Sequence, residues 1–126
     1  MSEDILIDGV IRGFSKPLIL WLVCVRPMYG YDLIKEFRRL TGKRLMPAVV
    51  YPFLHSLEER GYLVGKWVKK GKRQIKSYTI TRDGKKLLRR ITTLLGKPIR
   101  EMMMELLTRE NQSTLEYTNE FQEAYF

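Results

Sequence analysis

The most distinctive chemistry in this sequence is a concentrated block of cations. Residues 60–100 contain 14 lysines and arginines against one acid, Asp83, a net charge of +13. Residues 1–59 hold 8 bases and 7 acids, a net +1, and residues 101–126 hold Arg109 against six glutamates, a net −5. Such one-sided charge favours contact with a polyanion, above all nucleic acid, over a solvated lysine-rich face.

Residues that commonly catalyse reactions or bind metals are scarce. The 126 residues include one histidine, His55, and one cysteine, Cys24. An intramolecular disulfide and a zinc site are therefore not expected. The sequence also lacks a glycine-rich phosphate loop and a nucleophile elbow. We expect a protein that is not an enzyme and that needs no cofactor or metal.

The sequence predicts a cytoplasmic protein with no membrane partner. Its composition, 44% hydrophobic and 29% charged, is typical of one soluble globular domain. Glu3 and Asp4 stand where a signal peptide would carry bases, and the longest apolar run, Pro17 to Val25, is too short to span a bilayer.

The residues that precede the basic block are predicted to form helices that position it. Apolar residues at helical spacing predict a short helix over residues 5–14, broken near Gly13 and Ser15. Pro17 suits the first position of a second helix, and the apolar residues 18–25 predict that this helix lies in the core.

Two more helices should follow a turn at residues 26–30. The first is amphipathic, with Leu33, Ile34, Phe37 and Leu40 facing inward, and ends at Gly42. The second follows the connector 43–47 and ends at Gly61, with Pro52 within about its first turn. Its predicted buried stripe is Val50, Phe53, Leu54 and Leu57. Its predicted outward face is Ala48, Tyr51, Pro52, His55, Ser56 and Glu59.

The basic block itself begins with a predicted β-hairpin. Its strands are residues 62–69 and 75–81, rich in β-branched and aromatic residues, and its basic tip is residues 70–74. Thr81 is expected to cap a long helix that is interrupted at residues 96–98. Ser113 and Glu116 form a capping-box pattern for a last short helix.

An apolar stripe along the long helix predicts a homodimer, because a domain of this size has little other core to cover it. The predicted dimer residues are Leu87, Leu88, Ile91, Leu94, Leu95, Ile99, Met102, Met103 and Leu106.

Two helices, a short turn and a basic hairpin form a winged helix-turn-helix. We therefore expect a mostly α fold with a small β-hairpin and a long C-terminal dimerisation helix. Over residues 17–90 the sequence also resembles the PadR family of transcription regulators. The resemblance is carried by Met28, Gly30, Tyr31, Ile34, Lys35, Tyr51, Pro52, Leu54, Leu57, Glu58, Gly61, Tyr78, Ile80, Thr81, Gly84 and Leu88.

This resemblance implies a homodimeric regulator of transcription that binds double-stranded DNA, often a repressor released by a small-molecule effector. The DNA-binding domain would be residues 1–82 and the dimerisation region residues 83–126. Together with the outward helix face and the basic residues, the resemblance gives a predicted set of DNA-contacting residues. These are Tyr31, Lys35, Lys43, Arg44, Val49, Tyr51, Pro52, His55, Ser56, Lys69, Lys70, Lys72, Arg73 and Lys76.

The sequence departs from the family pattern at the start of the recognition helix. Met46 and Val49 stand where the family usually has Ser and Thr. These two residues either contact thymine methyls and sugars or leave the phosphate contacts to Lys43 and Arg44. The missing hydroxyls and the acidic tail keep an alternative open, a winged-helix module that binds protein or RNA.

Overall fold

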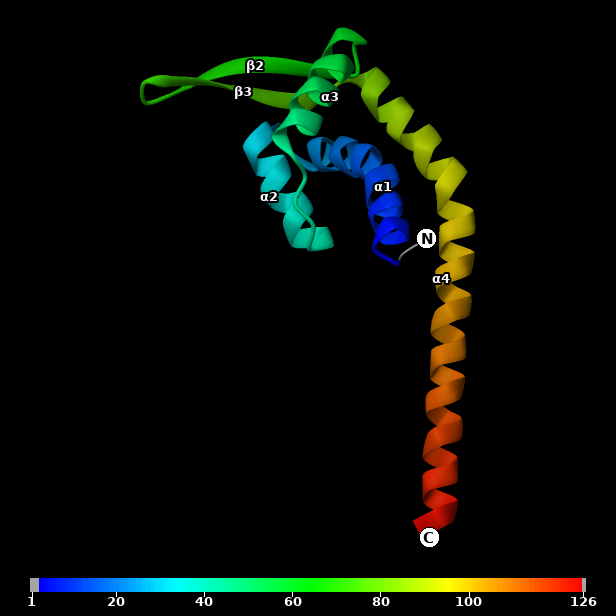
Figure 1. Ribbon diagram of the computed structural model, residues 1–126. Coiled ribbons are helices and arrows are strands. Elements are labelled where there is room, and N and C mark those ends of the chain that lie inside the picture. The colour runs from blue at the N-terminus through cyan, green and yellow to red at the C-terminus, as the bar shows by residue number, and fades with distance from the viewer. Residues whose placement is uncertain (1–2, 126) are drawn as a thin grey trace. The chain divides into compact units, whose positions relative to one another are not determined.

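The computed structural model describes residues 3–125, with side chains described to residue 113, and the chain divides into two compact units, residues 1–91 and 92–126. Four helices and a three-stranded antiparallel sheet give the winged helix-turn-helix fold with a long C-terminal helix that the sequence predicts. In order they are α1 (Glu3–Val25), β1 (Met28–Tyr29), α2 (Gly30–Thr41), α3 (Pro47–Glu59), β2 (Leu63–Lys70), β3 (Arg73–Ile80) and α4 (Arg82–Tyr125) (Figure 1).

The core of the first unit lies where α1, α2 and α3 meet the base of the sheet. Leu33, Val50 and Leu54 are fully buried there, and Leu57 is nearly so, which confirms the predicted stripe of α3. Leu40 was expected in this core, but it lies exposed in the last turn of α2. Leu40 lies one turn beyond the buried Phe37, and 42% of its surface stays exposed there.

The two predicted N-terminal helices are in fact one continuous helix, so the predicted break at residues 13–15 was wrong. Pro17 lies inside α1 and costs it one backbone hydrogen bond. The helix continues because Ile19, Leu20 and Val23 are buried in the core, which fixes its second half. The hydroxyl of Ser15 donates to the carbonyl of Arg12 at 2.8 Å instead of ending the helix.

A short strand, β1, was missing from the sequence-based prediction, which placed a turn at residues 26–30. β1 pairs antiparallel with β3, Met28 opposite Tyr78 and Tyr29 opposite Ser77, giving the sheet order β1-β3-β2. Two residues are too few to show the alternation that identifies a strand. The strand forms only because Tyr78 and Ser77 arrive beside it from far along the chain.

The predicted hairpin is confirmed, and it is tighter than expected. β2 and β3 pair from Leu63 opposite Ile80 to Lys70 opposite Arg73, which leaves a two-residue turn of Gly71 and Lys72. Gly71 has φ of +62°, a left-handed conformation that glycine adopts without strain. In Figure 1 the hairpin extends away from the helices that carry it.

The predicted helix ends are confirmed at Gly42, Gly61 and Thr81. Gly42 and Gly61 are left-handed, with φ of +73° and +80°. The hydroxyl oxygen of Thr81 accepts the N–H of Gly84 at 3.1 Å, so Thr81 caps α4. Pro52, however, is the sixth residue of α3, because α3 already begins at Pro47.

The helix α4 contains neither of the predicted breaks. It runs through residues 96–98, with Pro98 inside the helix, and past Ser113 to Tyr125. The side chain of Glu116 lies outside the described residues. Within the part of the chain that the structure describes, no helix is both long and apolar enough to cross a membrane.

Changing Gly84 to Ala should destabilise the protein. Gly84 is buried in the first turn of α4, and a Cβ there would overlap the backbone carbonyl of Tyr62. Backbone yields less readily than a side chain, so we expect a loss of about 1–3 kcal/mol in the free energy of unfolding. Chemical denaturation measures it.

A matched control is Gly9→Ala, in the interior of α1, where a Cβ meets nothing within 4 Å. That change should stabilise the protein by about 0.5–1 kcal/mol, because alanine is the better helix former. Equal effects of the two changes would contradict the packing described for Gly84.

Candidate nucleic-acid interface

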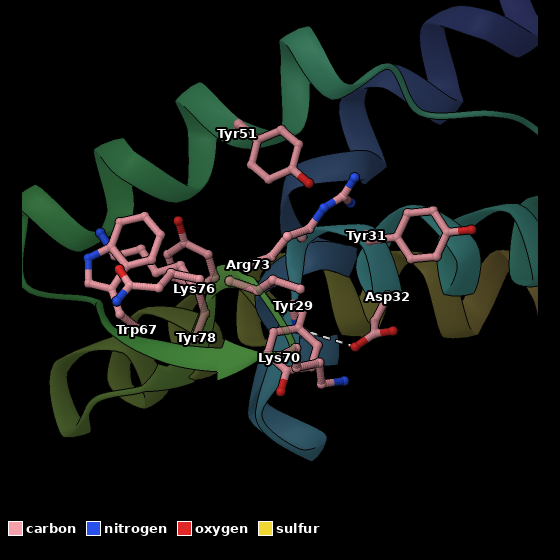
Figure 2. Close-up of a pocket in the computed structure, with 12 residues that line it drawn as sticks. Tyr29, Tyr31, Asp32, Tyr51, Trp67, Lys70, Arg73, Lys76 and Tyr78 are labelled. Atoms are coloured by element: carbon pink, nitrogen blue, oxygen red, sulfur yellow. Dashed lines mark hydrogen bonds between the residues drawn. The ribbon is translucent and has the colours of Figure 1, made fainter.

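A cleft of about 660 Å³ opens between the hairpin, the start of α2 and α3 (Figure 2). Its lining combines aromatic rings with cations from the hairpin. The lining residues are Tyr29, Gly30, Tyr31, Asp32, Tyr51, Trp67, Lys70, Arg73, Gln74, Ile75, Lys76 and Tyr78. The cleft brings together α2, α3 and the hairpin, three of the elements from which the sequence predicts nucleic-acid contacts; the connector with Lys43 and Arg44 does not line it.

Tyr51 reaches into the cleft from α3 and packs on Gly30, the first residue of α2. A Cβ on Gly30 would overlap the Tyr51 ring, so this close approach requires glycine. The Tyr51 side chain nevertheless keeps nearly half of its surface exposed, at 46%. The ring is thus anchored by packing while part of it remains available to a ligand.

The start of α2 presents two aromatic rings beside cations. Lys70 Nζ lies 4.4 Å from the centroid of the Tyr29 ring, and Lys35 Nζ lies 5.6 Å from that of Tyr31. The Tyr29 N–H donates to the carboxylate of Asp32 at 3.4 Å, which satisfies one donor at the start of α2. Tyr31 is 65% exposed.

The hairpin tip carries four exposed cations. They are Lys69, Lys70, Lys72 and Arg73. No ion pair holds any of the four among the residues that the structure describes. Long cationic side chains at an exposed tip are suited to binding phosphate oxygens.

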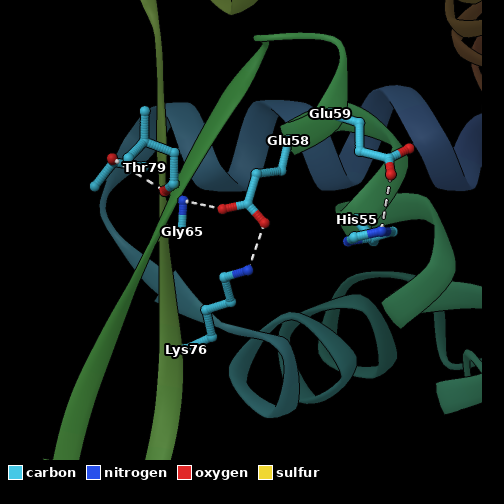
Figure 3. Close-up of polar contacts among 7 residues, drawn as sticks. His55, Glu58, Glu59, Gly65, Lys76 and Thr79 are labelled. Carbon is cyan, nitrogen blue, oxygen red and sulfur yellow. Dashed lines mark hydrogen bonds and ion pairs between the residues drawn. The ribbon is translucent and has the colours of Figure 1, made fainter.

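Lys76 was predicted to contact DNA, but its ammonium group points toward α3. Its Nζ lies 2.5 Å from Glu58 Oε1, and the other oxygen of Glu58 accepts the N–H of Gly65 at 2.8 Å (Figure 3). Both side chains are about three-quarters buried. An engaged, largely buried ammonium is a poor phosphate ligand, so we remove Lys76 from the predicted contacts.

This ion pair also shifts the acidity of both partners. The hydrogen bond with Lys76 holds the pKa of Glu58 below its usual value, against the opposing effect of burial. The same hydrogen bond raises the pKa of Lys76. Burial raises the pKa of Tyr78, on the same face of the hairpin.

The stability contributed by Glu58 should depend on pH. Because the pKa of Glu58 is lower in the folded state, its contribution is complete at neutral pH and is lost as the pH falls through that lowered value. The advantage of the wild type over Glu58→Gln in thermal melts should therefore shrink below about pH 4, the region of the unfolded-state pKa. An advantage that persists unchanged at pH 2 would contradict it.

The other predicted contact residues differ in their exposure and in whether an ion pair holds them. His55 Nε2 lies 3.1 Å from Glu59 on the exposed face of α3, and Lys43 Nζ lies 3.9 Å from Asp8. Ser56 is half-buried. The remaining predicted residues of α2, the connector and α3 are exposed: Tyr31, Lys35, Arg44, Val49, Tyr51 and Pro52.

The sequence-based prediction did not include Tyr29, Trp67 and Tyr78 in the cleft. Trp67 is 61% exposed although it is a large aromatic residue. Strand alternation offered a signal, because Trp67 lies two residues from Gly65 and pairs with Lys76. Among the described residues, no cluster of His, Cys, Asp and Glu could hold a metal ion.

The chain has relatives among known proteins. A sequence model of the transcriptional regulator PadR-like family matches residues 19–90. No curated protein sequence matches the chain. Among solved structures, a candidate transcriptional regulator from Thermoplasma acidophilum shares 32% identity over 79% of this chain and 96% of its own, with a TM-score of 0.66.

Two further structures are similar to this chain. A PadR family transcriptional regulator from Eggerthella lenta shares 25% identity over 79% of this chain and 90% of its own, with a TM-score of 0.68. Bacillus subtilis PadR, crystallised in complex with operator DNA, shares 30% identity over 59% of this chain and 44% of its own, with a TM-score of 0.55.

Proposed function

Because the chain belongs to the PadR-like family of transcriptional regulators, we propose that it binds a specific double-stranded DNA site as a homodimer and represses transcription from that site. The proposal places the protein in the cytoplasm with the DNA that it regulates. The observation that carries it is the cleft, where Tyr51 from the exposed face of α3 and the exposed hairpin cations Lys70 and Arg73 lie together.

The exposed face of α3 is the proposed base-reading surface. A recognition helix contacts base edges in the major groove through residues near its start, where Val49, Tyr51 and Pro52 are exposed here. Because Val49 lacks a hydroxyl, its proposed role is apolar contact with a thymine methyl or a sugar. His55 and Ser56 lie one turn further along.

The surrounding cations are the proposed phosphate contacts. They position the protein on the duplex without reading sequence. They come from the start of α2, the connector before α3 and the hairpin: Lys35, Lys43, Arg44, Lys69, Lys70, Lys72 and Arg73. A relative, Bacillus subtilis PadR, has been crystallised in complex with operator DNA, which supports duplex DNA as the ligand.

The homodimer is proposed from two exposed apolar surfaces. On α4, Met102, Met103 and Leu106 lie on one side of the helix and are 55%, 47% and 50% exposed. On the first half of α1, Leu6 and Val10 are 58% and 61% exposed. Contiguous apolar surface on a protein that is otherwise rich in charge marks a site of association.

Part of the predicted dimer stripe belongs instead to the subunit's own core. Leu88 is 9% exposed and packs in the core of the first unit, with Leu87 and Ile91 against it. The side chain of Leu88 therefore has little surface left for a partner. The proposed dimer contacts on α4 are now Leu94, Leu95, Ile99, Met102, Met103 and Leu106.

The proposed function is tested by titration against three nucleic acids of one length at one salt concentration. The targets are duplex fragments selected by the protein from genomic DNA, single strands of the same sequence, and the corresponding RNA. We expect the selected duplex to bind about a thousandfold more tightly than unrelated duplex, the lower end of the usual specificity range of about 10³–10⁷. Equal or tighter binding of RNA would instead favour the alternative module.

Replacing Tyr51 by Phe should weaken DNA binding without destabilising the protein. The phenylalanine ring keeps the packing on Gly30, and the missing hydroxyl, on a side chain that is 46% exposed, is the group proposed to donate to DNA. One missing hydrogen bond costs about 1 kcal/mol, close to fivefold in affinity. Fluorescence anisotropy measures the affinity, and a melting curve serves as the control; a lower melting temperature with full affinity would assign Tyr51 to packing alone.

A further inference from the structure

We propose that Glu58 is a positioning residue for the hairpin: with Gly65 and Lys76 it forms a polar clamp that sets the direction of the basic tip relative to α3. The inference rests on the proposed function, because the tip matters as a DNA contact. It adds a residue that contacts no DNA itself.

The clamp joins three elements through one carboxylate. Glu58 stands at the end of α3, one of its oxygens accepts from the backbone of Gly65 in β2, and the other binds the ammonium of Lys76 in β3. Among the described residues, these are the polar contacts that run directly between α3 and the hairpin. Figure 3 shows the carboxylate between the helix and both strands.

The absence of a side chain at Gly65 makes room for this arrangement. A Cβ at this position would overlap Glu58 Oε2 and the end of the Lys76 side chain. A side chain at residue 65 would have to displace the ends of Glu58 and Lys76, so glycine is what lets the clamp close in its observed geometry. Here φ does not require glycine, so the requirement comes from the clamp itself.

The clamp lies near the base of the hairpin, far from its basic tip. Five residue pairs, from Lys66–Ser77 to Lys70–Arg73, lie between Gly65 and the turn, and the last three of them lie beyond Lys76 as well. At about 3.3 Å per residue the tip lies roughly 20 Å from Gly65. A rotation of the hairpin by about 10° at Gly65 would therefore move the turn by about 3 Å, the length of a hydrogen bond, and the nearer Lys69 by about 2 Å.

On the other side of the sheet, the hairpin is held by β1. Tyr29 pairs with Ser77, and its ring lies beneath Lys70. This second attachment connects the hairpin to α2. Leu63 and Tyr78 fix the base of the hairpin by apolar packing in the core that it shares with α3. The clamp adds the directional polar contact between the hairpin and α3, and α3 and the tip must engage the same duplex together.

This ion pair is better explained by the orientation that it gives the hairpin than by a contribution to stability. A largely buried pair incurs a desolvation cost that offsets much of its attraction, and apolar residues of similar size often stabilise a protein as well. A carboxylate that accepts from a fixed backbone N–H and binds a fixed ammonium admits one orientation. Apolar side chains would admit several.

The test is the double variant Glu58→Leu with Lys76→Met, compared with wild type by melting, hydrogen exchange and DNA titration. The melting temperature should change little. Amide exchange of residues 66–76 in the absence of DNA should accelerate about tenfold as the hairpin gains freedom. The log–log salt slope for duplex binding should fall by about 0.9 for each phosphate that the tip no longer neutralises in a subunit.

The control variant is Glu36→Gln with Arg39→Met, which removes an exposed ion pair of 2.8 Å on α2. It should show wild-type exchange and slope. Glu58→Gln, which keeps the shape of the side chain, is the second variant should the double variant fold poorly. The amide-exchange rates and the salt slope of Glu58→Gln should lie between those of the wild type and those of the double variant.

The outcomes separate this inference from the proposed function. Wild-type hairpin exchange in the clamp variants overturns it. A lower melting temperature with the wild-type salt slope also overturns it, because a merely structural contact would give that result. Faster exchange in a protein that binds no duplex, even as wild type, would support the clamp and refute the proposed function.

Discussion

Removal of the four cations at the hairpin tip should lower the affinity for duplex DNA of every sequence by about two orders of magnitude at an ionic strength of about 0.15 M. The variant changes Lys69, Lys70, Lys72 and Arg73 to Ala. All four side chains are exposed, and no carboxylate among the described residues pairs with them. Their charge is therefore available to phosphates, and replacing the four residues should remove every phosphate contact that the tip makes.

The salt dependence identifies the cause of that weaker binding. Each cation that neutralises a phosphate releases condensed counterions, so the log–log slope should flatten by about 0.9 for each phosphate no longer neutralised in a subunit. The ratio between selected and unrelated duplex should hardly change, because phosphate contacts carry no sequence information. Equilibrium titrations at several salt concentrations measure both quantities.

A control variant distinguishes direct phosphate contact by the hairpin tip from a general effect of the protein's net charge. Arg38→Ala with Arg39→Ala removes two cations at the end of α2 away from the cleft, whose lining comes from the start of that helix. Its slope should match the wild type. An unaltered slope in the hairpin variant would exclude the tip. The remaining candidates for phosphate contacts would then be Lys35 of α2, Lys43 and Arg44 of the connector, and Lys85, Lys86, Arg89 and Arg90 at the start of α4.

The parts of the fold that the sequence predicted well are determined by local chemistry. Thr81 as a cap, Gly42 and Gly61 as helix ends, and the buried stripe of α3 each depend on a few neighbouring residues. The hairpin was found because β-branched and aromatic residues gather on both sides of a glycine. A short window of sequence contains all that these features need.

The features that the sequence did not reveal depend on residues far apart in the chain. β1 exists only because β3 lies beside it. Lys76 looked like one more cation of a basic hairpin, yet Glu58, 18 residues earlier, holds it. Pro17 indicated a helix start, but burial of the following turn outweighs the one hydrogen bond that it removes.

The second large effect is expected from charge placed on the proposed dimer surface of α4. The variant Met103→Glu with Leu106→Glu should raise the dimer dissociation constant at least a hundredfold. Burying a carboxylate in an apolar interface without a partner costs several kcal/mol in either subunit. Within one chain the two side chains are 47% and 50% exposed, so the folded subunit should survive the change.

DNA affinity should fall together with dimerisation. A dimer engages two half-sites about one helical turn apart, and a monomer keeps only one of them. We therefore expect the duplex affinity to drop about a hundredfold, while a duplex carrying a single half-site is bound as weakly by wild type as by the variant. Sedimentation equilibrium and anisotropy titrations on the same samples measure the two effects.

The neighbouring Met104 supplies the matched control. It is 61% exposed, at least as much as its neighbours, but it lies about 100° around the helix from Met103 and off the apolar stripe. Met104→Glu should leave both the dimer and the DNA affinity intact. If Met104→Glu weakens the dimer as much as the double variant does, added charge rather than the apolar stripe controls association. If the wild type itself sediments as a monomer at micromolar concentration, α4 does not join two subunits on the two half-sites, and the apolar face of α1 must be explained without a second copy.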